Sequence, residues 1–324
     1  MKKWMKAIAT MMVLSMAMTG CGGSGDSADD AAGKYKVGIV QQLEHPALDA
    51  ATLGFQEKLT ELTDGNVVFD YQNAQGEQTN CTTIATKFVS DGVDLIMANA
   101  TTALQSAADA TADIPIVGTS VTDYVTAGVV DSNEAPGRNV TGASDLAPID
   151  EQIAMLMELV PDVQKVGIVY CSAEPNSIYQ AELAQKELDA ANVAWAEYTA
   201  ADSNEVQSVV TKAVSECDVL YVPTDNTMAN NTEIIKNVAV PAGVPVIAGE
   251  EGICSGCGVA TLSISYYDLG AKAAEMAYEI LVNGANPAEM PVEYVSEGIT
   301  EKYNAEIAET LNIAIPEDMV AIGE

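Results

Sequence analysis

The feature that most constrains the fold is a set of short apolar runs that occurs twice along the chain. Lys36–Val40 reads KVGIV, and Lys165–Val169 reads KVGIV again at an offset of 165 − 36 = 129 residues. Asp94 and Asp218 each open a further apolar run, at an offset of 218 − 94 = 124 residues. Pairs in the same order at nearly constant spacing predict a duplicated plan. The alternative, that any parallel α/β domain repeats such runs, also predicts two lobes of similar design.

The apolar runs alternate with helical patterns, which is typical of parallel sheets. We therefore predict an α/β fold with two Rossmann-like parallel-sheet lobes, joined by three crossover segments and hinged around a cleft. The predicted boundaries are 34–120 plus 252–290 for lobe 1, 145–248 plus 291–324 for lobe 2, and 121–144 and 249–251 for the hinge crossings.

Composition excludes one large class of partner. The chain has 324 residues with 14 Lys+Arg against 47 Asp+Glu, for a formal charge of −33. Nucleic-acid backbones are held mainly by Lys and Arg, so binding to nucleic acid is disfavoured. A strongly acidic surface keeps a protein soluble, and we expect a monomer.

The N-terminal segment reads as a targeting signal rather than as part of the fold. Residues 1–20 combine early Lys residues with an apolar stretch that is too short to span a bilayer. The segment ends in Met-Thr-Gly before Cys21, which resembles the lipobox of bacterial lipoproteins. This resemblance implies that Cys21 becomes the lipidated first residue. The composition of the segment that follows, rich in Gly, Ser and Asp, predicts that 21–33 is a flexible, acidic tether. A plain secretory signal with an incidental Cys is the alternative.

The remaining cysteines do not form an obvious framework. Five are left once Cys21 is assigned to an anchor, and an odd number argues against full disulfide pairing. Cys254 and Cys257 form a CSGC motif, for which a local disulfide and two free thiols both stay open. A zinc site needs about four ligands, and His45 is the one His in the sequence. We predict no metal and no cofactor.

Polar side chains are expected where the strands end, because ligands of open parallel sheets sit beyond the carboxyl ends of the strands. The predicted ligand-binding residues are hydroxyls, amides, acids and one His: His45, Thr101, Thr102, Ser120, Thr122, Asp123, Asn176, Ser177, Thr224, Asp225, Asn226 and Glu250. The set contains no Lys, no Arg and no phosphate-binding glycine loop, which disfavours a phosphate or sulfate ligand.

The chemistry of this set favours an amino acid. The helix starts at Thr101–Thr102 and Asn176–Ser177 offer free backbone N–H groups to a carboxylate. Asp123 and Asp225 can pair with an ammonium group. The same residue types also cap helices and form turns, so that reading stays open for each single position. The sequence contains no nucleophile elbow and no P-loop, and we predict that the protein is not an enzyme.

Several motifs carry a family resemblance. They are His45–Asp49 (HPALD), Ser120–Asp123 (SVTD), Asn176–Ser177, Pro223–Thr227 (PTDNT) and Tyr266–Gly270 (YYDLG). With these, essentially the whole chain after the leader resembles ABC-transporter substrate-binding lipoproteins of the tryptophan/tyrosine type, which have the type I periplasmic-binding-protein fold.

The resemblance implies an extracytoplasmic protein, anchored to the outer face of a bacterial cell membrane. It implies capture of a small zwitterion, with an aromatic amino acid favoured, and delivery to an ABC permease and its ATPase. Cys254 and Cys257 depart from the family pattern beside the cleft and leave the ligand's identity open. A sensing lipoprotein that serves a membrane receptor is one alternative. A sugar- or nucleoside-binding protein of the same fold is another.

Overall fold

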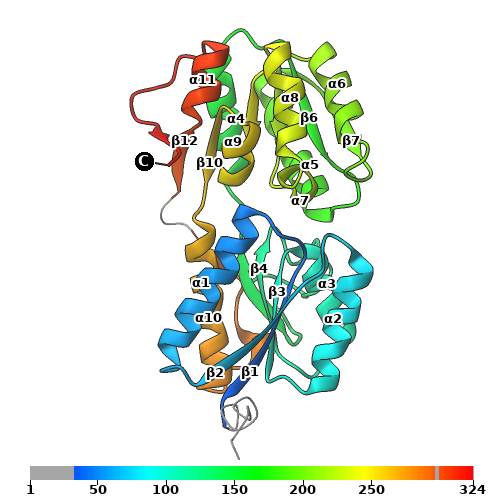
Figure 1. Cartoon of the computed structure of the whole chain (residues 1–324), viewed down its shortest axis with the longest axis vertical. Helices are drawn as coiled ribbons and strands as arrows, with labels where there is room; N and C mark the ends of the chain where they lie inside the picture. The colour runs from blue at the N-terminus through cyan, green and yellow to red at the C-terminus, as the bar shows by residue number, and fades with distance from the viewer. Residues whose placement is uncertain (1–32, 296–298, 324) are drawn as a thin grey trace, which may run out of the picture. The chain divides into compact units, whose positions relative to one another are not determined.

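The computed structural model describes residues 33–295 and 299–323. Its strands form one six-stranded and one seven-stranded sheet within these residues, each flanked by helices (Figure 1). The prediction of an α/β fold with two parallel-dominated lobes is confirmed. The predicted leader 1–20, Cys21 and all but the last residue of the predicted tether lie outside the described residues.

The sheet of the first lobe is parallel throughout, in the order β11-β5-β4-β3-β1-β2. Its central strands are continuous apolar runs because helices cover both faces. The strands are β1 (Tyr35–Gln41), β2 (Val67–Asn73), β3 (Leu95–Asn99), β4 (Ile116–Val121), β5 (Val140–Ser144) and β11 (Glu293–Tyr294).

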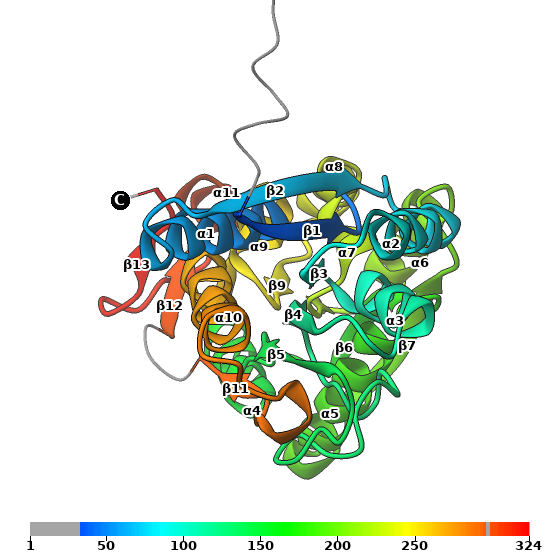
Figure 2. The same cartoon turned by 90° about the horizontal axis from the view of Figure 1, so that it is seen from below.

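Four helices flank this sheet, two on each face (Figure 2). They are α1 (Pro46–Leu62) and α10 (Tyr266–Leu281) on one face, and α2 (Gln78–Asp91) and α3 (Thr101–Ala110) on the other. The α1 and α10 backbones approach closely through Gly54 and Gly270. A Cβ atom on either glycine would collide with the backbone of the opposite helix, at Tyr267 or Ala51. This contact fixes α10 to the first lobe, although most strands of the second lobe precede it in sequence.

The sheet of the second lobe has the order β13-β12-β10-β9-β8-β6-β7, and only the β10–β12 pair is antiparallel among its described strands. The strands are β6 (Lys165–Cys171), β7 (Ala194–Ala200), β8 (Val219–Val222), β9 (Val246–Ala248), β10 (Ala260–Ser263), β12 (Thr300–Tyr303) and β13 (Val320–Ala321).

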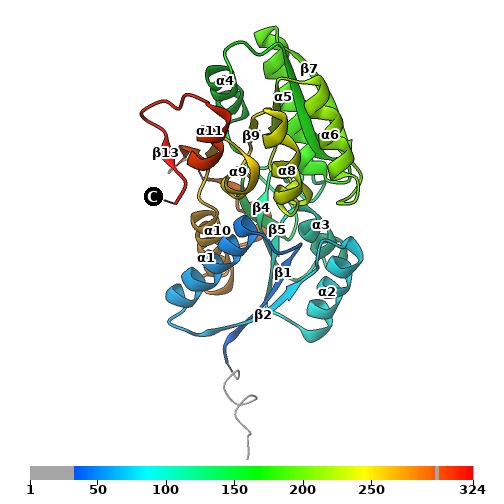
Figure 3. The same cartoon turned by 45° about the horizontal axis from the view of Figure 1, so that its top comes forward.

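The helices of the second lobe include the C-terminal one, which lies beside α9 in Figure 3. They are α4 (Ile149–Leu159), α5 (Pro175–Ala191), α6 (Val206–Glu216), α7 (Asn226–Ala229), α8 (Thr232–Ala242), α9 (Glu251–Cys257) and α11 (Ala305–Leu311). A short 3-10 turn, η1 (Pro287–Glu289), instead contacts β5 of the first lobe. No described helix is both long enough and apolar enough to cross a membrane.

The duplicated plan is visible in hydrogen bonds as well as in strand order. The Asp94 carboxylate accepts from the backbone N–H of Lys36 at 2.7 Å, and the Asp218 carboxylate accepts from that of Lys165 at 2.8 Å. Each Asp also donates its own N–H to the carbonyl of the same Lys. The two matching aspartates therefore fix the start of the central strand in each lobe.

One segment predicted as a hinge crossing is instead a strand. Val140–Ser144 pairs in parallel with β4 and is buried along its whole length. Its sequence, VTGAS, reads as a turn because Gly142 interrupts it. Glycine is needed there, since a Cβ atom would collide with the backbone of Gly118 and with the Tyr124 hydroxyl. The chain leaves the first sheet only after Ser144.

The pairing also differs from the predicted boundaries near residue 252. Glu251–Cys257 forms α9, and β10 (Ala260–Ser263) joins the second sheet beside β9, so the return to the first lobe comes after Ser263. Glu250 caps α9 by accepting from the N–H groups of Gly252 and Ile253, which turns a glycine-rich stretch into helix. In the segment 291–324, predicted as lobe 2, β11 pairs with β5 of the first sheet.

Candidate functional site

The carboxyl ends of the strands from both lobes meet around a small inner cavity of ≈ 10 Å³. Its walls come from the β1–α1 loop, the end of β4, the segment after β5 and the loops that precede α5, α7 and α9. The lining residues are His45, Leu48, Ser120, Asp145, Asn176, Thr224, Asp225, Asn226, Ala229, Glu250 and Tyr266. Seven of these belong to the predicted set: His45, Ser120, Asn176, Thr224, Asp225, Asn226 and Glu250.

Three buried carboxyl groups face this cavity. The residues Asp145, Asp225 and Glu250 are each at most 3% exposed. No Lys or Arg is among the described residues that line it. A buried carboxylate without a cation is costly, so burial raises the pKa of Asp145 to about 6 and that of Glu250 to about 7. Burial, followed by the charge of Glu174, also raises the pKa of Asp225.

Each of the three carboxyl groups is held in place by protein donors. Asp225 accepts from the backbone N–H of Cys171 at 2.6 Å and from that of Met228 at 2.8 Å. Asp145 accepts from the Tyr266 hydroxyl and from the Thr122 hydroxyl, both at 3.0 Å. These contacts orient the carboxyl groups but supply no full positive charge, which leaves the cavity suited to a cationic group.

A chain of hydrogen bonds links the two lobes beside the cavity. His45 Nε2 lies 3.2 Å from Asn226 Oδ1, and Asn226 Nδ2 donates to Glu174 at 2.7 Å. The Nδ2 bond to a carboxylate leaves Oδ1 as the acceptor toward His45, so Nε2 must carry the proton. Burial lowers the pKa of His45 and keeps the ring neutral. Nδ1 is therefore an acceptor.

Three polar atoms of cavity-lining residues have no hydrogen-bond partner in the described part of the chain. They are His45 Nδ1, Ser120 Oγ and Asn176 Oδ1. Asn176 Nδ2 already donates to the carbonyl of Thr224 at 3.2 Å, which leaves its Oδ1 as a free acceptor. Buried polar groups are normally paired, so three unpaired atoms on one cavity indicate a polar ligand.

Backbone geometry gives Ser120 its unusual position. It has a φ of +57° and lies where the pairing of β4 and β5 shifts register. A non-glycine residue in the left-handed region at a β-bulge is strained, and such strain is concentrated at functional sites.

Gln180 makes a second interlobe contact. Gln180 Nε2, from α5, is 3.2 Å from the Thr122 hydroxyl of the first lobe and donates to the carbonyl of Thr224 at 3.0 Å. Gln180 Oε1 accepts from the N–H of Thr224 at 3.2 Å. One amide side chain thus ties the end of β4 to the loop after β8 and holds the lobes together.

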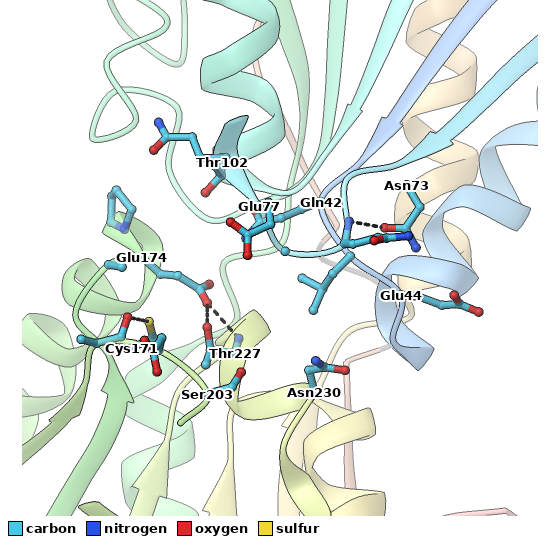
Figure 4. Close-up of a pocket in the computed structure, with 18 of the residues that line it drawn as sticks. Gln42, Glu44, Asn73, Glu77, Thr102, Cys171, Glu174, Ser203, Thr227 and Asn230 are labelled. Carbon is cyan, nitrogen blue, oxygen red and sulfur yellow. Dashed lines mark hydrogen bonds between the residues drawn. The ribbon is translucent and has the colours of Figure 1, made fainter. Parts of the chain in front are cut away.

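A larger outer cleft of ≈ 840 Å³ lies between the lobes (Figure 4). Gln42 and Thr102 are on the first-lobe side, and Glu174, Thr227 and Asn230 are on the second-lobe side. Glu174 accepts from both the N–H and the hydroxyl of Thr227, at 2.8 and 2.7 Å.

The other predicted site residues lie outside the inner cavity. Thr102 lines the outer cleft. Thr101 and Ser177 are buried at the starts of α3 and α5, and Thr122 holds Asp145. Asp123 does not line the cavity: its carboxylate accepts from the N–H of Thr126 and from Asn133 within its own loop.

Sequence reasoning left several residues of this site out of the predicted set, among them Asp145, Glu174 and Gln180. Asp145 directly follows β5, so recognising that strand would have placed it at a carboxyl end. Glu174 precedes Pro175, a signature of a helix start. Gln180 lies one turn inside α5 and carries no sequence signal.

The CSGC motif contains two free, buried thiols, which settles the alternative that the sequence left open. Burial raises the pKa of both Cys254 and Cys257. The described residues contain no group of three or more His, Cys, Asp or Glu side chains that could hold a metal ion.

Comparison with known proteins places this chain in a family. Residues 36–323 match the profile of the ABC transporter substrate binding proteins. A tyrosine-binding protein of Clostridioides difficile is 40% identical over 300 residues, which cover 90% of this chain and 86% of that protein.

Two solved structures are also similar over most of the chain. An ABC domain in complex with L-Trp from Streptococcus pneumonia has a TM-score of 0.85 at 32% identity, and a ligand-free, open substrate binding protein with adhesive properties from Clostridium difficile has 0.69 at 37%. Each alignment covers 89% of this chain and 99% of the other.

These relatives are solute-binding proteins, which confirms the prediction that the chain is not an enzyme. Proteins of this kind are extracytoplasmic. The chain therefore belongs to the ABC transporter substrate-binding protein family, as its motifs predicted.

Proposed function

We propose that the protein captures an α-amino acid, preferably an aromatic one, between its lobes and delivers it to an ABC permease with its ATPase. The observation that carries this proposal is the inner cavity, where Asp145, Asp225 and Glu250 are buried without a Lys or Arg among the described lining residues. An ammonium group is the cation that would complete it.

The unpaired polar atoms of the cavity can form further hydrogen bonds with the ammonium and carboxylate groups of the ligand. The free acceptors His45 Nδ1 and Asn176 Oδ1 can each accept an N–H from the ligand. The Ser120 hydroxyl can donate to the ligand's carboxylate. The N-terminal turn of α5, where Asn176 lines the cavity, adds a positive dipole end, worth up to about 2 kcal/mol when partly buried. Both charges of a zwitterion thus find a counterpart.

The aromatic preference is supported by the relatives. One is described as tyrosine-binding and one was solved with L-Trp. In this chain, Leu43, Leu48 and Ala100 form an apolar cluster at the cleft, separate from the main cores of both lobes. An aromatic ring would bury apolar surface there.

Binding requires the lobes to separate first. The inner cavity of ≈ 10 Å³ has room for about one water molecule, whereas ligand pockets usually measure about 300–1,000 Å³. The His45–Asn226 and Gln180–Thr122 contacts would break on opening and re-form around the ligand. Micromolar affinity corresponds to about 8 kcal/mol, which a few charge-assisted hydrogen bonds of about 1.5–3 kcal/mol each and ring burial could supply.

Anchoring is the second part of the proposal. Lipidation of Cys21 would tether a monomeric body to the outer face of the cell membrane, because each buried acyl methylene contributes about 0.8 kcal/mol. Cells that express Cys21→Ser should release the protein from the membrane fraction into the soluble fraction. Retention of this variant in the membrane fraction would contradict the anchor.

A thermal-shift screen of the leaderless protein tests the ligand class. We expect tyrosine or tryptophan to raise Tm most among the twenty amino acids, and sugars and nucleosides to leave Tm unchanged. A ligand at 100 times its Kd stabilises by about 2.7 kcal/mol, which is readily measured. The absence of any shift from all twenty amino acids would contradict the proposal.

A further inference from the structure

Gln42 carries a buried carbonyl oxygen that the fold does not use. It directly follows β1, and its backbone is fixed on both sides: its N–H donates to Asn99 at 3.1 Å, and its C=O accepts from Gly76 at 2.8 Å. The residue is only 5% exposed, and Oε1 has no hydrogen-bond partner in the described residues. An unpaired buried acceptor costs about 1–3 kcal/mol, so its retention calls for a ligand donor.

The surroundings of Gln42 connect it to the inner cavity. It lines the outer cleft next to Leu43, and Leu43 packs in the same apolar cluster as Leu48, which lines the inner cavity. A ligand with its charged groups in the inner cavity and its ring over these leucines would direct the far edge of the ring toward Gln42.

Two other amides at the outer cleft are already engaged. Gln105 Nε2 donates to the carbonyl of Ala127 at 3.0 Å, and Asn73 Oδ1 accepts from the N–H of Gln75 at 2.7 Å. Of the described residues that line the outer cleft, Gln42 is the one with a buried, unpartnered side-chain oxygen.

We infer that Gln42 determines specificity by accepting a hydrogen bond from the ring of the ligand, so that a phenol O–H or an indole N–H is preferred over a plain phenyl ring. The inference rests on the proposed function and adds the side-chain selectivity of the same site. A phenyl ring would bury Gln42 Oε1 still more completely without pairing it. Sites built to pair a ligand's polar group reject the analogue that lacks it far more strongly than apolar pockets reject a size change.

Calorimetric titration of the leaderless protein with L-tyrosine, L-tryptophan and L-phenylalanine tests this inference. We expect the wild type to bind tyrosine or tryptophan at least about tenfold more tightly than phenylalanine. Gln42→Met, which has a similar volume and no acceptor amide, should reduce this ratio to about onefold by weakening tyrosine and tryptophan while phenylalanine binding is kept or improved. Retained phenylalanine binding also shows that the variant is folded.

Two further variants sharpen the test. Gln105→Met makes the same substitution in the same cleft at an amide that is already paired, and it should leave the ligand ratio as in the wild type. Gln42→Glu keeps a carboxyl acceptor and should restore the preference for ring donors. If Gln42→Met keeps the wild-type ratio, the inference is wrong while the proposed function stands. If the wild type binds none of the three ligands, both are wrong.

Discussion

The two lobes share their strand plan but bring different chemistry to the cleft. In both, an Asp before the second central strand fixes the first residue of the KVGIV strand. At the opposite strand ends the lobes diverge. Around the inner cavity, the second lobe presents the acids Asp225 and Glu250, while the first lobe presents mostly neutral groups such as His45 and Ser120. In the outer cleft both lobes present acids, Glu44 and Glu77 from the first and Glu174 and Asp202 from the second.

This difference shows where a duplicated fold is free to change. The strand starts carry the structural Asp, which both copies need. The strand ends face the cleft and differ between the lobes. In the proposed function, the second lobe mainly recognises the ammonium group and the first lobe recognises the side chain of the ligand. Asp145, which follows β5, is the acid that a first-lobe strand end adds to the inner cavity.

The largest effect is expected from Asp225→Asn. The substitution keeps the size of the side chain but removes a negative charge from the proposed ammonium site, and charge-assisted hydrogen bonds are worth about 1.5–3 kcal/mol. We expect amino-acid affinity to fall about 10- to 100-fold by calorimetry. Asp218→Asn, before the same strand β8, is the matched control: it should lower the free energy of unfolding and leave the affinity unchanged. If Asp225→Asn and Asp218→Asn lowered the affinity equally, the distinction between a structural Asp at the strand start and a ligand-binding Asp at the strand end would be wrong.

The next effect concerns closure of the lobes. His45→Ala removes the bond to Asn226 and a proposed ligand acceptor, and we expect about a tenfold loss of affinity. In a double-mutant cycle with Asn226→Ala, the two losses should not add, because each single variant already breaks the bond between the lobes. Fully additive losses would show that this contact does not contribute to the bound state.

The pH dependence of binding should follow the acids of the cavity. The pKa of Asp145 is about 6 and that of Glu250 about 7 in the ligand-free protein, because both are buried. A bound ammonium would favour their ionised forms, so affinity should rise several-fold between pH 5.5 and 7.5. Titration in buffers of different ionisation enthalpy should show proton release on binding. Uptake of protons on binding would contradict the proposal that a bound ammonium group ionises Asp145 and Glu250.

The raised pKa values also predict how the stability of the ligand-free protein depends on pH. The contribution of these carboxyl groups to its stability should fall as pH rises, whereas the affinity for the ligand should increase. A carboxyl group whose pKa is higher in the folded state stabilises the fold at low pH and loses this contribution as pH rises through the folded-state value. For Asp145 the loss should run from about pH 4 to about pH 6. Urea unfolding of the wild type and Asp145→Asn over this range should show the variant gaining relative stability with pH. If the difference in unfolding free energy between the two proteins stays constant over this pH range, the raised pKa of Asp145 is wrong.

The smallest effect is expected from Asp123→Ala. Sequence reasoning placed this residue at the ammonium site, but its carboxylate is bonded to Thr126 and Asn133 in its own loop. We expect less than about a twofold change in affinity, within the range of surface substitutions. A loss comparable with that of Asp225→Asn would return Asp123 to the site.

The sequence predicted what depends on apolar periodicity and missed what depends on packing. The KVGIV strands and the polar loop after β8 were predicted because burial and turn chemistry leave local signals. β5 was missed because Gly142, required by the Tyr124 hydroxyl above it, resembles a turn. Asp123 was chosen and Asp145 was overlooked for a related reason: both follow strands, and only the packed fold shows that the Asp123 carboxylate turns back into its own loop.

The most direct test of the account compares L-tyrosine with 3-(4-hydroxyphenyl)propanoate, which has the same ring and carboxylate but no amino group. Calorimetry with the wild-type leaderless protein at pH 7.5 measures the contribution of the ammonium group alone. We predict binding of tyrosine and at least about a hundredfold weaker binding of the deaminated acid, because three buried carboxyl groups would then lack their cation. Equal affinity for the two compounds would contradict the central claim that this cavity is built for an ammonium group.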